Sequence, residues 1–308
     1  MTRILVTGAS GLLGLSLCLQ YAGQHELLGV TNAHGLPGAP FPVITANLTQ
    51  PSGVEKLIDL AQPEWIIHCA ALANIDQAEA QPQLAQRINA EVPGEFAAAA
   101  RRTGVKLVHI STDAVFDGQR GDYTEEDAPN PLSVYASTKL AGERVVAEAN
   151  PDAIIARVNF YGWSLSGKRS LAEFFFNNLV EGRPAKGFTD IYFCPLQVNQ
   201  LAEILLRMAA LKLSGLFHVL SCEALSKYDF GCRIARQFGL DDTLVQPVSW
   251  KDGSLTAVRS PFLNLRTEKL AAALGAPLPD QAPGLQRLAA QYHEGYCDQL
   301  RAFAAQGA

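Results

Sequence analysis

Short apolar runs alternate with longer amphipathic stretches through the first half of the chain. The apolar runs are rich in Ile, Val and Leu, which is typical of strands buried on both faces of a parallel sheet. These predicted strands are Arg3–Thr7, Glu26–Thr31, Pro42–Ala46, Glu64–Ala70, Val105–Ile110 and Ala153–Val158. The predicted helices between them are Gly11–Tyr21, Ser52–Ala61, Gln83–Thr103 and Ser133–Ala149. Strands that alternate with helices in this way predict an α/β fold with a doubly wound parallel sheet.

The alternation becomes irregular after about residue 160. A loop rich in glycine, serine and aromatic residues leads into further helical patterns and one last predicted strand, Leu216–Leu220. The helices predicted here are Ser170–Glu181, Val198–Leu211, Lys227–Phe238, Thr267–Leu274 and Gly284–Ala305. We expect residues 1–160 to form the sheet domain, to which 196–220 return. Residues 161–195 and 221–308 would form a smaller, mostly C-terminal substrate lobe over the ligand-binding edge of the sheet.

Composition excludes several classes of partner. The chain has 308 residues and a net charge of −5, whereas nucleic-acid-binding domains normally carry a basic excess. No apolar segment is long enough to span a membrane, and the N-terminal residues do not have the pattern of a signal peptide. The six cysteines form no CxxC pair and no spacing typical of a metal site. We therefore expect a cytoplasmic protein with reduced, mostly buried thiols, no metal, and no nucleic-acid or membrane partner.

A glycine-rich turn stands between the first predicted strand and the first predicted helix. Its sequence, Thr7–Gly14, has the spacing GxxGxxG rather than GxGxxG. Glycines allow a tight turn there and let backbone N–H groups approach a pyrophosphate at the helix N-terminus. The turn therefore predicts a Rossmann-type site for a dinucleotide, NAD or NADP. The residues expected to contact it are Gly8, Ser10, Gly11, Leu12 and Gly14.

The end of the second strand normally distinguishes NAD from NADP, through an acid at the ribose 2′-hydroxyl or an arginine at the 2′-phosphate. Thr31 and Asn32 stand there, with neither an acid nor an arginine, which slightly favours NADP. Asn47 and Leu48 follow the third strand and would contact adenine, although Asn47 fits a turn equally well.

The ends of the later strands supply the remaining candidates for the cofactor site. The small residues Cys69, Ala70 and Ala71 end the fourth strand, where either a cofactor or a closely packed helix would require them. Phe160 follows the sixth strand and would border the nicotinamide. All of these positions lie at the carboxyl ends of parallel strands, where ligands of doubly wound sheets bind.

Tyr135 and Lys139 lie four residues apart in a predicted helix, and therefore on one face of it. A nearby ammonium favours a phenolate, so we expect the Tyr135 pKa to fall towards neutrality and the phenol to exchange a proton with a substrate oxygen. Thr112 follows the fifth strand and would hydrogen-bond the same oxygen, with Ser111 as the alternative, since neighbouring strand residues face opposite ways. Asn89 would hold a water beside Lys139 or serve only as a polar helix residue. This order of residues predicts hydride transfer.

The motifs resemble those of the extended short-chain dehydrogenases/reductases, with TGxxGxxG at Thr7–Gly14 and YxxxK at Tyr135–Lys139. Within that superfamily the chain is most similar to dTDP-4-dehydrorhamnose reductases. The similar stretches are Ile110–Gly118, with ISTDAVFDG for ISTDYVFDG, then Tyr123–Asp127, Pro129–Tyr135 and Ser137–Glu143, together with His68–Ala71 and Asp76–Glu79. The resemblance implies a catalytic triad of Thr112, Tyr135 and Lys139, with both Tyr135 and Lys139 also at the cofactor.

By the same resemblance, the expected reaction is the NAD(P)H-dependent reduction of the 4-keto group of a nucleotide-activated 6-deoxy sugar. A nucleotide sugar would be the small-molecule partner, and a homodimer is the candidate assembly.

The chain departs from this group where the sugar nucleotide would bind. Ala114 replaces the tyrosine of STDYVF, Tyr192–Leu196 replace a GSPT stretch, and Arg259–Pro261 only loosely match an arginine–proline element. The departures also resemble the regulatory β subunit of methionine adenosyltransferase, so a cofactor-binding regulatory subunit is one alternative. A nucleotide-sugar epimerase or dehydratase is another, ranked last because Ala114, beside Asp113, is not acidic.

Three residues of the predicted substrate lobe and its approach are candidates for contact with a diphosphate or a nucleobase. They are Trp163, Arg157 and Arg259. The run Phe174–Phe176 fits the apolar core better than a stacking platform for a base.

Overall fold

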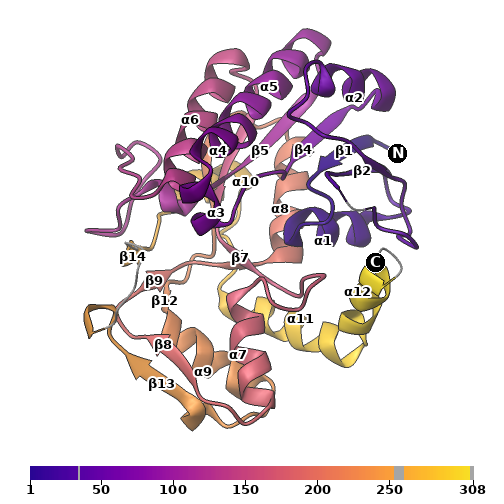
Figure 1. Ribbon diagram of the computed structural model, residues 1–308. Helices are drawn as coiled ribbons and strands as arrows, with labels where there is room; N and C mark the ends of the chain where they lie inside the picture. The colour runs from indigo at the N-terminus through magenta and orange to yellow at the C-terminus, as the bar shows by residue number, and fades with distance from the viewer. Residues whose placement is uncertain (34, 253–259, 306–308) are drawn as a thin grey trace.

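The computed structural model describes residues 1–33, 35–252 and 260–305 (Figure 1). Its centre is a seven-stranded parallel sheet with the order β11-β6-β5-β4-β1-β2-β3. The strands are β1 (Arg3–Thr7), β2 (Glu26–Thr31), β3 (Val43–Thr45), β4 (Trp65–His68), β5 (Lys106–Thr112), β6 (Ile154–Val158) and β11 (Gly215–Val219). The predicted doubly wound α/β fold is therefore confirmed. Strand order reverses between β1 and β4, which opens a crevice outside their carboxyl ends.

Alternate strand residues bury opposite faces of the sheet. Leu5, Ile66 and Leu107 pack under α2 (Gly53–Ala61), α5 (Val92–Thr103) and α6 (Val134–Ala149). Ile4, Val6 and Val108 pack under α1 (Leu12–Tyr21) and α8 (Val198–Ala210) on the other face (Figure 1). Coverage on both faces explains why the strands are continuously apolar. No helix in the described part of the chain combines the length and apolarity required to cross a bilayer.

The prediction of one helix over Gln83–Thr103 is wrong in its middle. The segment consists of α4 (Pro82–Gln86), a π-helical turn η1 (Arg87–Glu91) and α5. Pro93 has no N–H to offer the carbonyl of Asn89, four residues earlier, so the regular ladder is interrupted there. A Cβ at Gly142 of α6 would lie only 2.2 Å from that carbonyl oxygen, so α6 packs closely over the π turn.

A second predicted helix, Gly284–Ala305, is also divided. The chain forms α11 (Gln281–His293) and α12 (Tyr296–Ala305), separated at Gly295, whose φ of +78° ends the first helix in the left-handed conformation. The other predicted helices of this half are α7 (Leu171–Val180), α9 (Lys227–Gln237) and α10 (Glu268–Leu274), near their predicted positions. A short helix, α3 (Ile75–Ala80), had no counterpart in the prediction.

Short strands join the elements of the lower part in Figure 1. β8 (Ala185–Phe188) pairs with β13 (Val245–Val248), and β9 (Tyr192–Phe193) lies between β12 (Leu225–Ser226) and β14 (Phe262–Leu263). β7 (Phe160–Tyr161) pairs with β10 (Leu196–Gln197) where the chain leaves and re-enters the sheet region. Phe175 and Phe176 are buried and Phe174 is 44% exposed, so the expectation of a core role holds for two of the three.

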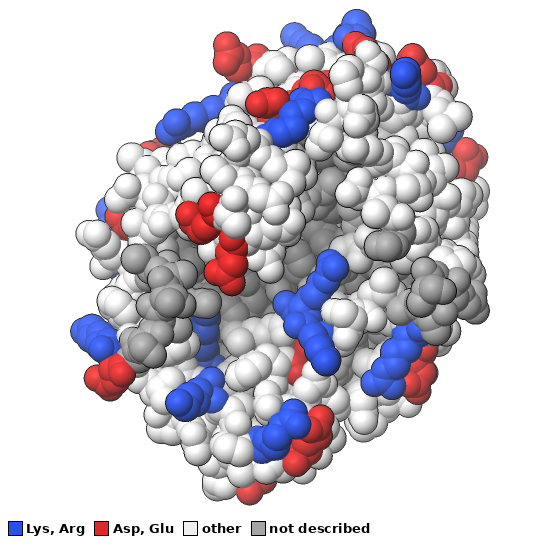
Figure 2. Space-filling model, in the orientation of Figure 1, with Lys and Arg blue, Asp and Glu red and all other residues white. Residues whose placement is uncertain are grey.

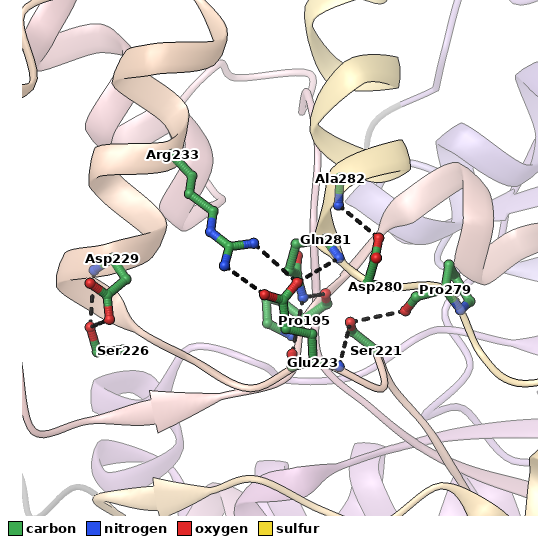
Figure 3. Close-up of polar contacts among 10 residues, drawn as sticks. All are labelled: Pro195, Ser221, Glu223, Ser226, Asp229, Arg233, Pro279, Asp280, Gln281 and Ala282. Carbon is green, nitrogen blue, oxygen red and sulfur yellow. Dashed lines mark hydrogen bonds and ion pairs between the residues drawn. The ribbon is translucent and has the colours of Figure 1, made fainter.

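A polar cluster joins the segment after β11 to α9 and α11 (Figure 3). Both Glu223 carboxylate oxygens accept from Arg233, at 2.5 and 3.0 Å, and one also accepts from the backbone N–H of Gln281 at 3.1 Å. The Gln281 side chain donates to the carbonyl of Pro195 at 2.8 Å. Because these residues come from three distant segments, the cluster fixes the smaller part against the carboxyl edge of the sheet.

Candidate active site

The glycine turn between β1 and α1 is shaped by close backbone approaches. Gly8 has a φ of +68°, and a Cβ on it would lie 2.8 Å from the backbone nitrogen of Ala70. A Cβ on Gly14 would lie 2.4 Å from the carbonyl oxygen of Gly8. The N-cap residue Gly11 provides no side-chain cap, and the first turn of α1 carries no acid. The amides at the start of this helix are therefore available to an anion.

A cavity of about 500 Å³ lies over this turn. Most of the predicted cofactor residues line it: Gly8, Ser10, Gly11, Thr31, Asn32, Asn47, Leu48, Cys69, Ala70 and Ala71. Leu12 and Gly14 are not on its wall, because Leu12 packs against the core and Gly14 against the turn itself. Asn47 lines the cavity, and its Oδ1 accepts from the backbone N–H of Thr49 at 3.0 Å, as expected for a turn residue; its contact with adenine stays a prediction. The glycine turn and the size of the cavity fit a dinucleotide.

Sequence reasoning missed part of this wall. The additional lining residues are Val30, Ala46, Thr49, Leu72, Gln77, Leu84, Ile88 and Arg169. Leu84 lies on α4 and Ile88 on the π turn. Their place on the cavity wall depends on the break between these two elements, which the apolar pattern of the sequence does not reveal. Arg169 comes from the loop after β7, and its sequence neighbourhood carries no phosphate-binding motif.

A second cavity, of about 250 Å³, contains the three predicted catalytic residues. Thr112, Tyr135 and Lys139 line it together with Phe160, and so do Asp113 and Asn159, of which Asn159 was not predicted. Cys69 and Ala71 line both cavities, which therefore adjoin at the end of β4. A dinucleotide along the first cavity would reach the triad in the second.

Hydrogen bonding distinguishes Thr112 from Ser111. Both residues line the cavity, but Ser111 donates its hydroxyl to the buried carboxylate of Glu143 at 2.5 Å. Thr112 hydrogen-bonds with Tyr135, accepts from the backbone N–H of Ala114 at 3.2 Å and donates to Asp113 at 3.1 Å. Thr112 is therefore the hydroxyl that stands beside the phenol.

The N-terminal turn of α6 positions the tyrosine. Ser133 caps this helix by accepting from the backbone N–H of Ala136 at 3.2 Å, and Tyr135 lies in the first turn. The expected fall in the Tyr135 pKa is wrong for this structure, because burial raises the pKa to about 12 while hydrogen bonding to Thr112 opposes the rise. The cation that was expected to lower it is engaged elsewhere: Lys139 Nζ donates to the carbonyl of Ile110 at 2.6 Å. At neutral pH the phenol therefore carries its proton.

Burial shifts the pKa values of Lys139 and Asp113 in opposite directions. Burial lowers the pKa of Lys139 to about 8, with the Glu143 carboxylate opposing the fall, so the amine is mostly cationic at pH 7. Burial raises the pKa of Asp113 to about 6, although hydrogen bonds from Asn159, at 2.6 Å, and Thr112 favour the carboxylate. This cavity thus holds a cation, a neutral phenol and a carboxyl group that titrates near neutrality.

Three residues that were candidates for contact with substrate or water bond to other protein groups instead: Arg157, Trp163 and Asn89. Arg157 is 2% exposed and pairs with Glu143 at 2.8 Å, and the Trp163 indole donates to the carbonyl of Leu288 at 2.9 Å. Neither is free for a diphosphate or base, and Arg259 lies outside the described residues. Both side-chain N–H donors of Asn89 are taken, by the carbonyl of Leu72 and by Thr138, so it stabilises a loop and α6 rather than donating to a water at Lys139.

Enzymes of the short-chain dehydrogenase/reductase class have a tyrosine and a lysine one helical turn apart, beside the nicotinamide end of a Rossmann-type crevice. The fold and the site put this chain in that class. The chain belongs to the family described as the RmlD substrate binding domain, whose model matches residues 1–294.

Individual relatives agree with this assignment. A probable low-salt glycan biosynthesis reductase, Agl14, of Haloferax volcanii is 32% identical over 294 residues, which cover 94% of this chain and 98% of the relative. Methionine adenosyltransferase 2 subunit beta of Mus musculus is 33% identical over 256 residues, covering 80% and 75%. The crystal structure of dTDP-4-dehydrorhamnose reductase from Bacillus anthracis in complex with NADP superposes with a TM-score of 0.82 at 27% identity, covering 93% of this chain and 98% of that one.

Proposed function

We propose that this protein catalyses the NAD(P)H-dependent reduction of the 4-keto group of a nucleotide-activated 6-deoxy sugar. The observation that carries the proposal is the junction of the two cavities at Cys69 and Ala71. Thr112, Tyr135 and Lys139 line the second cavity, next to a space that a dinucleotide would fill. The solved NADP complex of a dTDP-4-dehydrorhamnose reductase, with the same fold, supports the cofactor and the substrate class.

A bound NAD(P)H would supply the hydride. The glycine turn would hold its pyrophosphate, Thr31 and Asn32 would face the adenosine ribose, and Lys139 would reach the nicotinamide ribose. The slight preference for NADP rests on the absence of an acid at Thr31–Asn32, where a carboxylate would repel a 2′-phosphate.

The protein's own part in the reduction is proton donation to the carbonyl oxygen of the substrate. Tyr135, neutral because burial raises its pKa to about 12, donates its proton as negative charge develops on that oxygen. Thr112 orients the same oxygen by a hydrogen bond. The Lys139 cation, in a site with little water, favours the phenolate that remains after proton donation. Asp113 and Asn159 line the same cavity and would accept or donate hydrogen bonds at sugar hydroxyls.

The direct test is the oxidation of NADPH and NADH, followed by absorbance, with dTDP-4-keto-6-deoxyglucose as substrate. The assay is run with and without a 3,5-epimerase. Oxidation that requires the epimerase would identify a dTDP-rhamnose-type reductase, whereas oxidation without it would identify a reductase of a different 4-keto sugar. Clear cofactor binding without oxidation of either nucleotide would contradict the proposed reaction.

A regulatory function is the second candidate, and the 33% identity to methionine adenosyltransferase 2 subunit beta favours it. In this case the dinucleotide site would stabilise a binding protein rather than supply a hydride. The distinguishing measurement is whether the purified chain binds a methionine adenosyltransferase catalytic subunit and changes its KM or its inhibition by product. An epimerase or dehydratase remains the least supported reading, since Ala114 offers no second acid beside Asp113.

A further inference from the structure

Arg169 is the only charged side chain among the described residues that line the 500 Å³ cavity. No carboxylate lies on the described part of that wall either. The Arg169 guanidinium makes no hydrogen bond or ion pair with any described residue, whereas its backbone N–H does. A lone cation on the wall of a cavity sized for a dinucleotide has a natural counter-charge in the phosphates of that ligand.

The backbone beneath this arginine is firmly held. Glu173, fully buried, accepts from the backbone N–H groups of Arg169 at 2.8 Å, Ser170 at 2.9 Å and Ser164 at 2.6 Å. Ser170 completes a capping box at the start of α7 and donates its hydroxyl to the carbonyl of Gly162 at 2.7 Å. Because the loop is tied at both ends, the guanidinium is presented from a fixed base, which reduces the conformational entropy lost on binding.

The loop also starts beside the glycine turn. A Cβ on Gly162 would lie 3.6 Å from the side chain of Leu12, the first residue of α1. Arg169 therefore belongs to a segment that packs against the helix end where backbone amides are free for an anion. In Figure 2, Lys and Arg side chains of the lower part of the molecule stand at the margin of a central hollow.

We propose that Arg169 binds the pyrophosphate of the dinucleotide, opposite the amides of the glycine turn, and so holds the cofactor from the smaller lobe. This inference rests on the proposed cofactor and deepens it by naming a residue that the glycine motif does not contain. The arginine would supply the positive charge that the turn itself lacks. It would also link cofactor binding to the position of the lobe, since α7 follows Arg169 directly.

The test compares Arg169→Met with Lys168→Met, a matched change at the preceding exposed basic residue, which does not line the cavity. Titration calorimetry would measure the Kd of NADH, NADPH and ADP-ribose, with adenosine as a phosphate-free probe. Arg169→Met is expected to weaken NADH, NADPH and ADP-ribose alike by about tenfold or more, and adenosine by less than about twofold. The salt dependence of their binding should also become shallower. Lys168→Met should leave all four unchanged, and circular dichroism would confirm that both variants fold.

Each outcome decides a separate question. Weakening of NADPH alone would mean that Arg169 contacts the 2′-phosphate, which overturns the pyrophosphate assignment. Unchanged binding of all three phosphate-containing ligands would refute any phosphate role for Arg169 and leave the proposed reductase function intact. A wild-type chain that binds neither dinucleotide would overturn the proposed function and this inference together.

Discussion

Glu143 and Arg157 form an ion pair with 2.8 Å between oxygen and nitrogen, and their side chains are only 6% and 2% exposed. A second nitrogen of Arg157 donates to the other carboxylate oxygen at 3.0 Å, and Ser111 donates to that oxygen as well. The pair thus lies at Ser111, which precedes Thr112 on β5 and is opposite Arg157 in the strand register, and one helical turn from Lys139 on α6. It connects the strand and the helix that carry the candidate catalytic residues.

Glu143→Ala should reduce the free energy of unfolding by about 3 kcal/mol or more, because it leaves the Arg157 charge buried without its partner. Urea unfolding followed by circular dichroism would measure the loss. Glu148→Ala, an exposed position on the same helix with no ion pair in the described structure, is the matched control and should change stability by less than about 0.5 kcal/mol. Equal effects of the two substitutions would show that the buried pair does not stabilise this edge.

Tyr135→Phe should lower kcat by about 10²–10⁴-fold, because it removes the proton donor while keeping the ring. The Kd of NADPH, measured by fluorescence, should change by less than about threefold, since the glycine turn and most of the cavity wall are untouched. Turnover at the wild-type rate would exclude Tyr135 as the proton donor.

The pH dependence of reduction should follow Lys139. Its pKa lies near 8, and the cation is the form that favours the phenolate, so kcat/KM should fall as pH rises through about 8. Glu143→Gln removes the carboxylate that raises the pKa of Lys139, and this fall should then begin at a lower pH. A pH profile measured for both proteins at constant ionic strength would check the sign of the shift.

Asp113 predicts a pH dependence of stability that also arises from burial, through a pKa shift in the opposite direction. Its pKa is about 6 in the folded protein, above the ordinary value of 3.8, so the folded state favours the protonated carboxyl. The stabilisation is therefore complete below pH 4 and is lost as pH rises through about 6. The shift of roughly two pK units corresponds to at most about 3 kcal/mol. Between pH 4 and pH 7 the Asp113→Asn variant should become more stable relative to wild type. A difference in the free energy of unfolding that does not change with pH would contradict the raised pKa of Asp113.

Gly142→Ala tests the packing of α6 against the π turn. The added Cβ would lie 2.2 Å from the backbone oxygen of Asn89, which has no flexible end to move, so about 1–3 kcal/mol of stability should be lost. The control, Gly35→Ala, adds a methyl group with no neighbour within 4 Å. Thermal unfolding of both variants would show a fall in Tm for the first alone.

The sheet and most of the helices could be predicted because continuous apolar runs and helical periodicity are local signals. The π turn at Arg87–Glu91 could not, since it depends on a missing N–H at Pro93 and on how closely α6 approaches. The break at Gly295 left a visible signal, the glycine itself, which a continuous helical pattern outweighed.

In the candidate site, too, the motif residues could be predicted from the sequence, whereas contacts between distant segments could not. Motif positions such as Gly8 and Tyr135 lie on the two adjoining cavities, as the sequence predicts. The pairing of Arg157 with Glu143 and the arrival of Arg169 at the cavity depend on segments brought together only by folding. The direction of the Tyr135 pKa shift could not be predicted, because helical spacing places Lys139 nearby without revealing that its ammonium donates to the carbonyl of Ile110.

The outermost strand of the sheet, β11, comes from a segment far beyond the other six strands, and among the described strands it pairs with β6 alone. A fragment that stopped at residue 160 would contain β6 but leave its outer edge without a hydrogen-bonding neighbour. Such an edge is a template for strands of other molecules, so the fragment would be prone to aggregation. During synthesis, the outer edge of β6 therefore stays unpaired until residues 215–219 have emerged, and β11 then becomes the edge strand of the sheet.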